Sequence, residues 1–124
     1  MSFRTITSHH DGHGLAESLT IEADEPGPGG ASHAYLVSRG YPAGIVVADI
    51  QYQKGPRHEA GSTTGIIDPV LLAIVADRLE AFQAGPFACE ENAEALDAVH
   101  AAMAAFRRRA DERAKRAVLG TSKP

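Results

Sequence analysis

Tryptophan is absent from this sequence of 124 residues, and aromatic residues make up only 6% of it. A core built from this composition must be aliphatic and rich in alanine. Cys89 is the one cysteine, which excludes an internal disulfide and is compatible with a reducing compartment. The sequence also has no signal peptide pattern and no run of about 20 apolar residues, the length that spans a bilayer. We therefore expect a cytosolic protein with no membrane partner.

Neither sign of charge is in large excess, because the formal net charge is −4 and the pI is about 5.8. This balance argues against bulk binding of nucleic acid, which needs a basic surface. Residues 107–116 are different, since six Arg and Lys against two acidic residues give a local net charge of +4. A short cationic stripe on an acidic protein suits a small anionic ligand better than a duplex.

The first half of the chain has the patterns of β-strands and loops. Polar and apolar residues alternate in short runs, and the segment 45–53 is rich in β-branched residues. Segments dense in glycine, proline or polar residues separate these runs. Strands are therefore expected within 4–7, 18–22, 33–37 and 45–53, and loops at 24–32 and 54–65.

The second half has two helical patterns. Asp68 and Pro69 are typical of a helix start, with a carboxylate at the N-cap and proline at the first helical position. A second helix should begin near Cys89, after the turn 84–86, where Glu90 suits the positive end of the helix dipole. Spacings of three and four predict two buried stripes: Leu72, Val75, Leu79 and Phe82, then Leu96, Val99, Met103 and Phe106.

Strands that precede helices in this order indicate an α+β fold. We expect a small N-terminal antiparallel β-sheet over residues 1–67, followed by a C-terminal antiparallel two-helix hairpin over 68–124. Together they should form one compact domain. Because two helices and a thin sheet leave apolar faces uncovered, oligomerisation is expected.

Chemistry that breaks bonds has little support in the sequence. His9, His10, Asp11 and His13 carry groups that ligate metals, but their spacing matches no closed ligand set, and polar residues near a chain end are the favoured interpretation. The loop 24–32 lacks Walker and Rossmann spacing, which favours a plain surface loop. No nucleophile–base pair can be argued. We predict no catalytic residue, no metal site and no cofactor.

Binding chemistry has more candidates. Arg57 follows a strand end and a Gly-Pro turn, so its guanidinium could capture phosphate or carboxylate, or form a surface salt bridge. Phe82 fits the core by its periodicity, yet at a hairpin tip its ring could stack on a nucleobase. Asn92 could cap the second helix or read a base edge. Arg109 and Arg113 share a helical face and could bracket a diphosphate or form an exposed helix end. These alternatives stay open on the residues alone.

Several segments, taken in order, resemble the phage-encoded Thoeris anti-defence sponge family. The helical part also resembles the hairpin domain that this family shares with the phage anti-CBASS sponges. The resemblance covers most of the chain, and it rests on motifs with the right order and spacing rather than on any single one. They are DEPGPGGASHAY, QYQKGPRHEAG, LLAIVADRLEAFQAGPFACEENAEAL and RRADERAKRAVLGT.

The resemblance implies a protein of the infected host cytosol that binds glycocyclic ADP-ribose, the signal of a bacterial TIR-domain protein, without cleaving it. It implies a homodimer or homohexamer with pockets at protomer interfaces, and in some relatives a separate site for cyclic di- or trinucleotides. Phe82 would stack on the base, Asn92 would hydrogen-bond near it, and Arg57 and Arg109 would take the phosphates. Gln83 and Arg113 are added by proximity.

The sequence therefore leaves three hypotheses about function. The first is a non-catalytic binder of a cyclic ADP-ribose derivative, or alternatively of the cyclic di- or trinucleotides of CBASS. The second is a metal-dependent nucleotide hydrolase that uses the histidines near the N-terminus. The third is a structural module whose hairpin only oligomerises.

Overall fold

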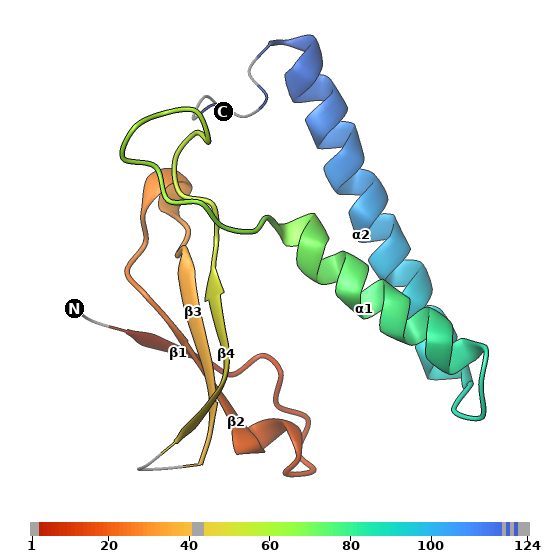
Figure 1. Cartoon of the computed structure of the whole chain (residues 1–124). Helices are drawn as coiled ribbons and strands as arrows, with labels where there is room; N and C mark the ends of the chain where they lie inside the picture. The colour runs from red at the N-terminus through yellow and green to blue at the C-terminus, as the bar shows by residue number, and fades with distance from the viewer. Residues whose placement is uncertain (1–2, 41–43, 118, 120, 122–124) are drawn as a thin grey trace. The chain divides into compact units, whose positions relative to one another are not determined.

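The computed structural model describes residues 3–40, 44–117, 119 and 121, and they form a four-stranded sheet followed by two α-helices (Figure 1). The chain divides into two compact units, Met1–Ile66 and Ile67–Pro124. The sheet lies in the first unit and the helices in the second. This confirms the predicted α+β fold, with its N-terminal antiparallel sheet and C-terminal pair of helices.

The sheet follows the chain without a crossover, because its strand order is β1-β2-β3-β4 and every neighbouring pair is antiparallel. The four predicted strand positions are confirmed within a few residues. The last strand ends two residues earlier than predicted, at Gln51. The strands are β1 (Arg4–Ile6), β2 (Leu19–Ala23), β3 (Ala34–Arg39) and β4 (Ile45–Gln51).

One face of the sheet is apolar and the other is mostly polar, as the period of two along each strand requires. Thr5 pairs with Glu22 on the polar face, and Ala23 is fully buried on the apolar one. The register aligns one half-buried apolar residue from each strand in a row across the sheet. This row is Ile6, Ile21, Val37 and Ala48.

The chain leaves β4 through a loop that closes on itself. Lys54 and Thr63 exchange two backbone hydrogen bonds of 2.9 and 2.8 Å, which close the loop between them at its base. Gly65 then passes so close to β4 that a Cβ there would lie 2.3 Å from the carbonyl oxygen of Gln51. Only glycine fits this approach.

The two helices are α1 (Asp68–Gln83) and α2 (Glu90–Lys115). The predicted start of the second helix is confirmed, because Cys89 is its N-cap. The predicted N-cap of the first helix is wrong by one residue, since Ile67 holds that position and Asp68 is already helical. Asp68 stays in the first turn, where its charge suits the helix dipole. In the described part of the chain, neither helix has the length and apolarity that crossing a bilayer requires.

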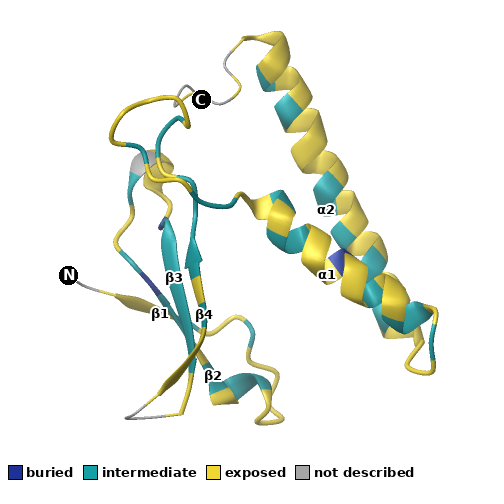
Figure 2. Ribbon diagram, in the orientation of Figure 1, coloured by how far each residue is buried: buried dark blue, intermediate teal, exposed yellow. Residues whose placement is uncertain are grey.

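The helices pack as a hairpin whose seam differs from the predicted stripes at two positions, one on each helix (Figure 2). Ala76 is buried at 4% exposure, whereas Val75 is 43% exposed, because 72, 76, 79 and 83 follow the helical period more closely than 72, 75, 79 and 82. Leu96, Val99 and Met103 are half-buried on α2 as predicted, while Phe106 is 38% exposed. Small alanines at this seam let the helices approach closely.

Candidate functional site

The turn between the helices and the helix ends beside it, residues 82–92, form what we call the hairpin tip. Its backbone is closed by hydrogen bonds from Gly85 N to Phe82 O at 3.2 Å and from Ala88 N to Gly85 O at 3.3 Å. Gln83 adds a side-chain bond, because its Oε1 accepts from Cys89 N at 3.0 Å. This amide therefore fixes the residue at which α2 begins, a position that has no side-chain cap of its own.

Asn92 also serves the turn. Its Nδ2 donates to the carbonyl oxygen of Phe87 at 3.4 Å, a long hydrogen bond that holds the turn against the first turn of α2. The expectation that Asn92 caps the helix is wrong, since the N-cap is Cys89 and Asn92 is the third helical residue. The amide oxygen of Asn92 and the amide nitrogen of Gln83 have no hydrogen-bond partner among residues 3–40 and 44–117. These groups remain open to a ligand that has both donors and acceptors.

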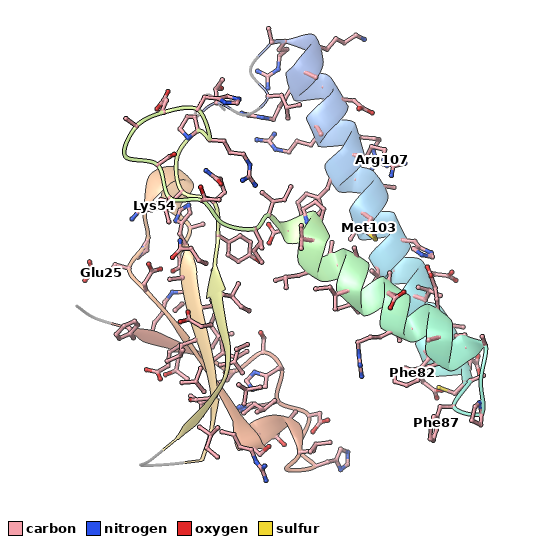
Figure 3. The ribbon with its side chains drawn as sticks, in the orientation of Figure 1. Glu25, Lys54, Phe82, Phe87, Met103 and Arg107 are labelled. Carbon is pink, nitrogen blue, oxygen red and sulfur yellow. The ribbon has the colours of Figure 1, made fainter. Side chains whose placement is uncertain are left out.

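Two aromatic rings, those of Phe82 and Phe87, lie at the hairpin tip (Figure 3). The rings of Phe82 and Phe87 are 6.2 Å apart between centroids and nearly perpendicular, at 89°. Phe82 is half-buried, while Phe87 is 71% exposed. The Cζ atom of Arg78, one helical turn earlier, lies 5.3 Å from the centroid of Phe82. The tip therefore presents an anchored aromatic ring of the kind on which a nucleobase stacks.

The charges around the tip do not suit phosphate. Glu80, Glu90, Glu91 and Glu94 lie on the helix ends next to it, and Arg78 is the one basic residue between positions 78 and 94. The positive end of the α2 dipole offsets these carboxylates only in part. A diphosphate bound here would need further cations from elsewhere.

A basic arm, residues 107–116, lies near the opposite end of α2. Arg113 donates from Nη2 to the carbonyl oxygen of Thr121 at 3.1 Å, and Arg116 pairs with Glu112. Arg109 is exposed, and no carboxylate lies within salt-bridge distance of it in the described ranges. Arg109 is therefore more available to an anion than Arg113, the other predicted arginine of the basic arm.

The hairpin tip and the basic arm are far apart within one chain. Arg109 follows Asn92 by seventeen residues on the same helix, which is roughly 26 Å at 1.5 Å per residue. In Figure 3, Phe82 and Phe87 lie at the turn and Arg107 lies far along α2 from them. The helix α2 has 26 residues against 16 in α1, so the basic arm extends past the partner helix. One hairpin brings Phe82, Gln83 and Asn92 together, but it does not bring Arg109 or Arg113 to them.

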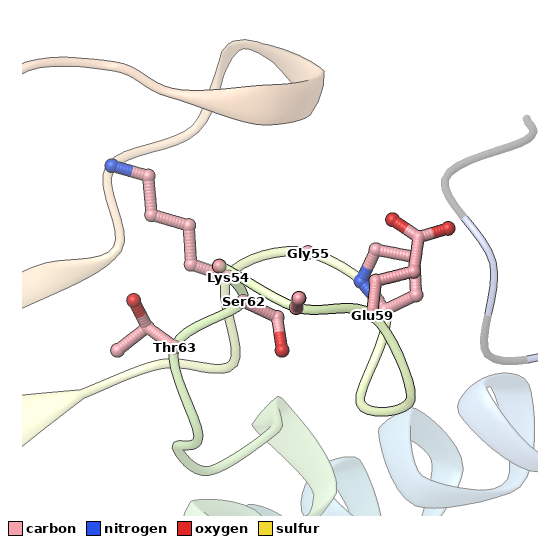
Figure 4. A pocket seen from close by; sticks show the side chains of 8 residues that line it. Lys54, Gly55, Glu59, Ser62 and Thr63 are labelled. Carbon is pink, nitrogen blue, oxygen red and sulfur yellow. The ribbon is translucent and has the colours of Figure 1, made fainter.

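Arg57 belongs to the other unit, in the closed loop that follows β4. Its Nη2 donates to the carbonyl oxygen of Gly65 at 3.1 Å, so in this structure the guanidinium braces the loop. A shallow hollow of about 310 Å³ lies in the same loop (Figure 4). Its lining includes Lys54, Glu59, Ser62 and Thr63, and Figure 4 shows the side chain of Lys54 running away from Glu59. This mixture has no strong charge of one sign, and Arg57 is not part of the wall.

The histidines near the N-terminus meet only as a pair, because the rings of His9 and His10 are in edge contact at 4.6 Å between centroids. His9 Nε2 donates to the carbonyl oxygen of Leu19 at 2.8 Å, and Asp11 Oδ1 accepts from His13 N at 3.0 Å. Across residues 3–40 and 44–117, no three His, Cys, Asp or Glu side chains are grouped to hold a metal ion. The donor set that the hydrolase hypothesis needs is therefore not assembled here.

Glu17 organises this segment instead. Its carboxylate accepts backbone hydrogen bonds from Gly14 at 2.6 Å, Asp11 at 2.6 Å and Gly12 at 3.2 Å. These bonds, of which that from Gly14 is the largest cause, lower the pKa of Glu17 from 4.5 to about 2. No sequence pattern indicates this role beyond a glutamate that follows a glycine-containing turn.

This depressed pKa makes the loop 11–14 sensitive to acid. Because the folded-state pKa lies below the ordinary value, the carboxylate stabilises the loop fully above pH 4.5 and loses this effect as the pH falls toward 2. The amide resonances of Gly12 and Gly14 should shift together over this window in an NMR titration. In Glu17→Gln they should be insensitive to it, whereas the control Glu94→Gln should titrate like the unmodified protein. A titration of these amides near pH 4.5 in the unmodified protein would contradict the assignment.

The comparisons with known proteins point to one group. The sequence model of the family described as Acb2/Tad1, hairpin domain, matches residues 44–111. The protein Thoeris anti-defense 1 of Bacillus phage SBSphiJ7 is 37% identical over 75 residues, which are 60% of this chain and 52% of that protein. The chain thus spans about half the length of the curated relative that it matches. The residues matched by the family model include the hairpin tip.

Proposed function

The chain belongs to the Acb2/Tad1 hairpin-domain family of anti-defence proteins, and from this membership we propose that it blocks Thoeris immunity by sequestration. The proposed ligand is glycocyclic ADP-ribose, made by a TIR-domain protein, which the chain binds in the host bacterial cytosol and does not cleave. The observation that carries this proposal is the hairpin tip, where an anchored aromatic ring lies beside open amide groups.

Each predicted residue has a role in this proposal. Phe82 stacks on the base, while Asn92 and Gln83 offer hydrogen bonds to its edge. The phosphates are taken by guanidinium groups, which pair with them in bidentate geometry. These groups are Arg57, Arg109 and Arg113.

We further propose that the site is shared between copies of the chain, in a homodimer or homohexamer. The tip and the arm are roughly 26 Å apart on one helix, too far for one small ligand to touch both. A second copy whose basic arm reaches the first copy's tip would supply the cations that the tip lacks. Exposed apolar side chains on β4, on α1 and at the N-cap of α1 support self-association. They include Ile45, Val46, Val47, Ile67, Val70 and Ile74.

The test is to incubate the protein with glycocyclic ADP-ribose, remove unbound ligand and then denature the protein with heat. A sponge returns the intact ligand in the supernatant, whereas a hydrolase returns products and a purely structural module retains nothing. Ligand at one hundred times its dissociation constant should also add about 2.7 kcal/mol to the free energy of unfolding. Failure of the protein to retain the ligand, or release of products, overturns the proposal. A parallel incubation with cyclic di- and trinucleotides tests the alternative ligand class.

A further inference from the structure

Arg78, one helical turn before the hairpin tip, holds a position that the binding roles above leave unexplained. Its guanidinium carbon lies 5.3 Å from the centroid of the Phe82 ring, at a distance typical of a cation–π contact. Among residues 3–40 and 44–117 no carboxylate lies within salt-bridge distance of it. Its N–H donors therefore have no acidic partner, although acidic side chains are plentiful on both helices.

The groups around Phe82 differ in how firmly they are held. Phe87 meets the ring at 89° and belongs to the turn, where its carbonyl oxygen accepts from Asn92. Arg78 is exposed, and only the end of its long, flexible side chain contacts the ring. An incoming base can therefore displace Arg78 from the ring more easily than it can move Phe87.

We propose that Arg78 forms the second wall of the base site. In the free protein its guanidinium covers the face of Phe82, and on binding the base takes that face while the guanidinium moves outward and stacks on the base from the other side. A guanidinium suits this stacking because it is planar and weakly hydrated, whereas the ammonium of lysine has no flat face. The ligand class is a nucleotide with a planar base, so this inference rests on the proposed function and adds a specificity-determining residue to it.

The test compares the affinity of three variants for glycocyclic ADP-ribose by calorimetry. Arg78→Ala should bind about tenfold more weakly, because one stacking surface is lost. Arg78→Lys should bind almost as weakly as Arg78→Ala, because it keeps the charge without the flat face. Arg39→Ala removes an exposed arginine at the end of β3 and should bind like the unmodified protein. Circular dichroism and native mass spectrometry establish that fold and assembly are unchanged.

Two results would overturn this inference. Equal or tighter binding by Arg78→Ala would mean that the guanidinium merely masks the ring, and full affinity in Arg78→Lys would mean that charge alone matters. Both results require that the unmodified protein binds the ligand. Absence of binding by the unmodified protein would instead refute the proposed function, so the two failures are distinguishable.

Discussion

Phe82→Ala is expected to lose retention of glycocyclic ADP-ribose while its oligomeric state stays unchanged. Stacking of a base on an aromatic side chain contributes roughly 1–3 kcal/mol, which corresponds to a loss of affinity on the order of 10- to 100-fold. The ring is half-buried beside Phe87 and Arg78, so its removal takes away the flat surface on which the base would lie. Calorimetry with the purified ligand measures the loss, and native mass spectrometry reports the assembly.

Two further variants separate stacking from folding. Phe82→Trp keeps a flat aromatic face and should retain the ligand, whereas Phe82→Leu keeps apolar volume without that face and should bind as poorly as the alanine variant. Phe3→Ala removes a ring that is 55% exposed in the other unit and serves as the matched control. Tight binding by the leucine variant would show that the base does not lie on this ring.

Mixing two inactive variants is expected to restore binding, because in the proposed site the tip and the basic arm come from different chains. Phe82→Ala and Arg109→Ala should each bind poorly alone. When they are unfolded together and refolded as dimers, half of the dimers contain one chain of each kind, and each of these has one intact site. About a quarter of the normal number of sites should reappear, as the two-fold symmetry of such a dimer requires. Calorimetric stoichiometry measures this fraction.

The double variant with both substitutions in one chain is the control for this experiment. Mixed with the unmodified protein, it gives hybrid dimers in which each of the two sites has one defect, so the hybrids should bind poorly. No recovery in the first mixture, combined with intact hybrid formation, would place the whole site within one chain. The distance along α2 makes that outcome incompatible with roles for both Phe82 and Arg109 at one ligand.

Most of the fold could be predicted because each element has a strong local pattern. The alternation in β2 and the β-branched run in β4 were sufficient to place these strands within two residues. The carboxylates after Cys89 located the start of α2. These signals act over a few residues, so they do not depend on the rest of the structure.

Features that depend on spatial neighbours were harder to predict. Val75 and Ala76 are both apolar and adjacent, and only the packing of α1 on α2 decides that Ala76 is buried and Val75 exposed. Ile67 became the N-cap of α1 although isoleucine is a poor capping residue. Gln83 fixes the start of α2 through a bond across the turn, which no pattern within either helix indicates.

The candidate site could be predicted in its parts but not in its arrangement. Phe82, Gln83 and Asn92 are neighbours at the tip, and their nearness follows from the hairpin alone. Arg78 was missed, although its spacing of four residues before Phe82 was a usable signal. Bonds from Arg113 to Thr121 and from Arg57 to Gly65 depend on tail and loop conformations that periodicity does not describe.

The length of α2 relative to α1 has a consequence for stoichiometry. Each chain has one hairpin tip at the start of α2 and one basic arm near its end, so it supplies one of each. In the proposed shared site every tip in a closed ring faces a basic arm of another copy, so the expected number of bound ligands equals the number of chains, whether the ring contains two copies or six.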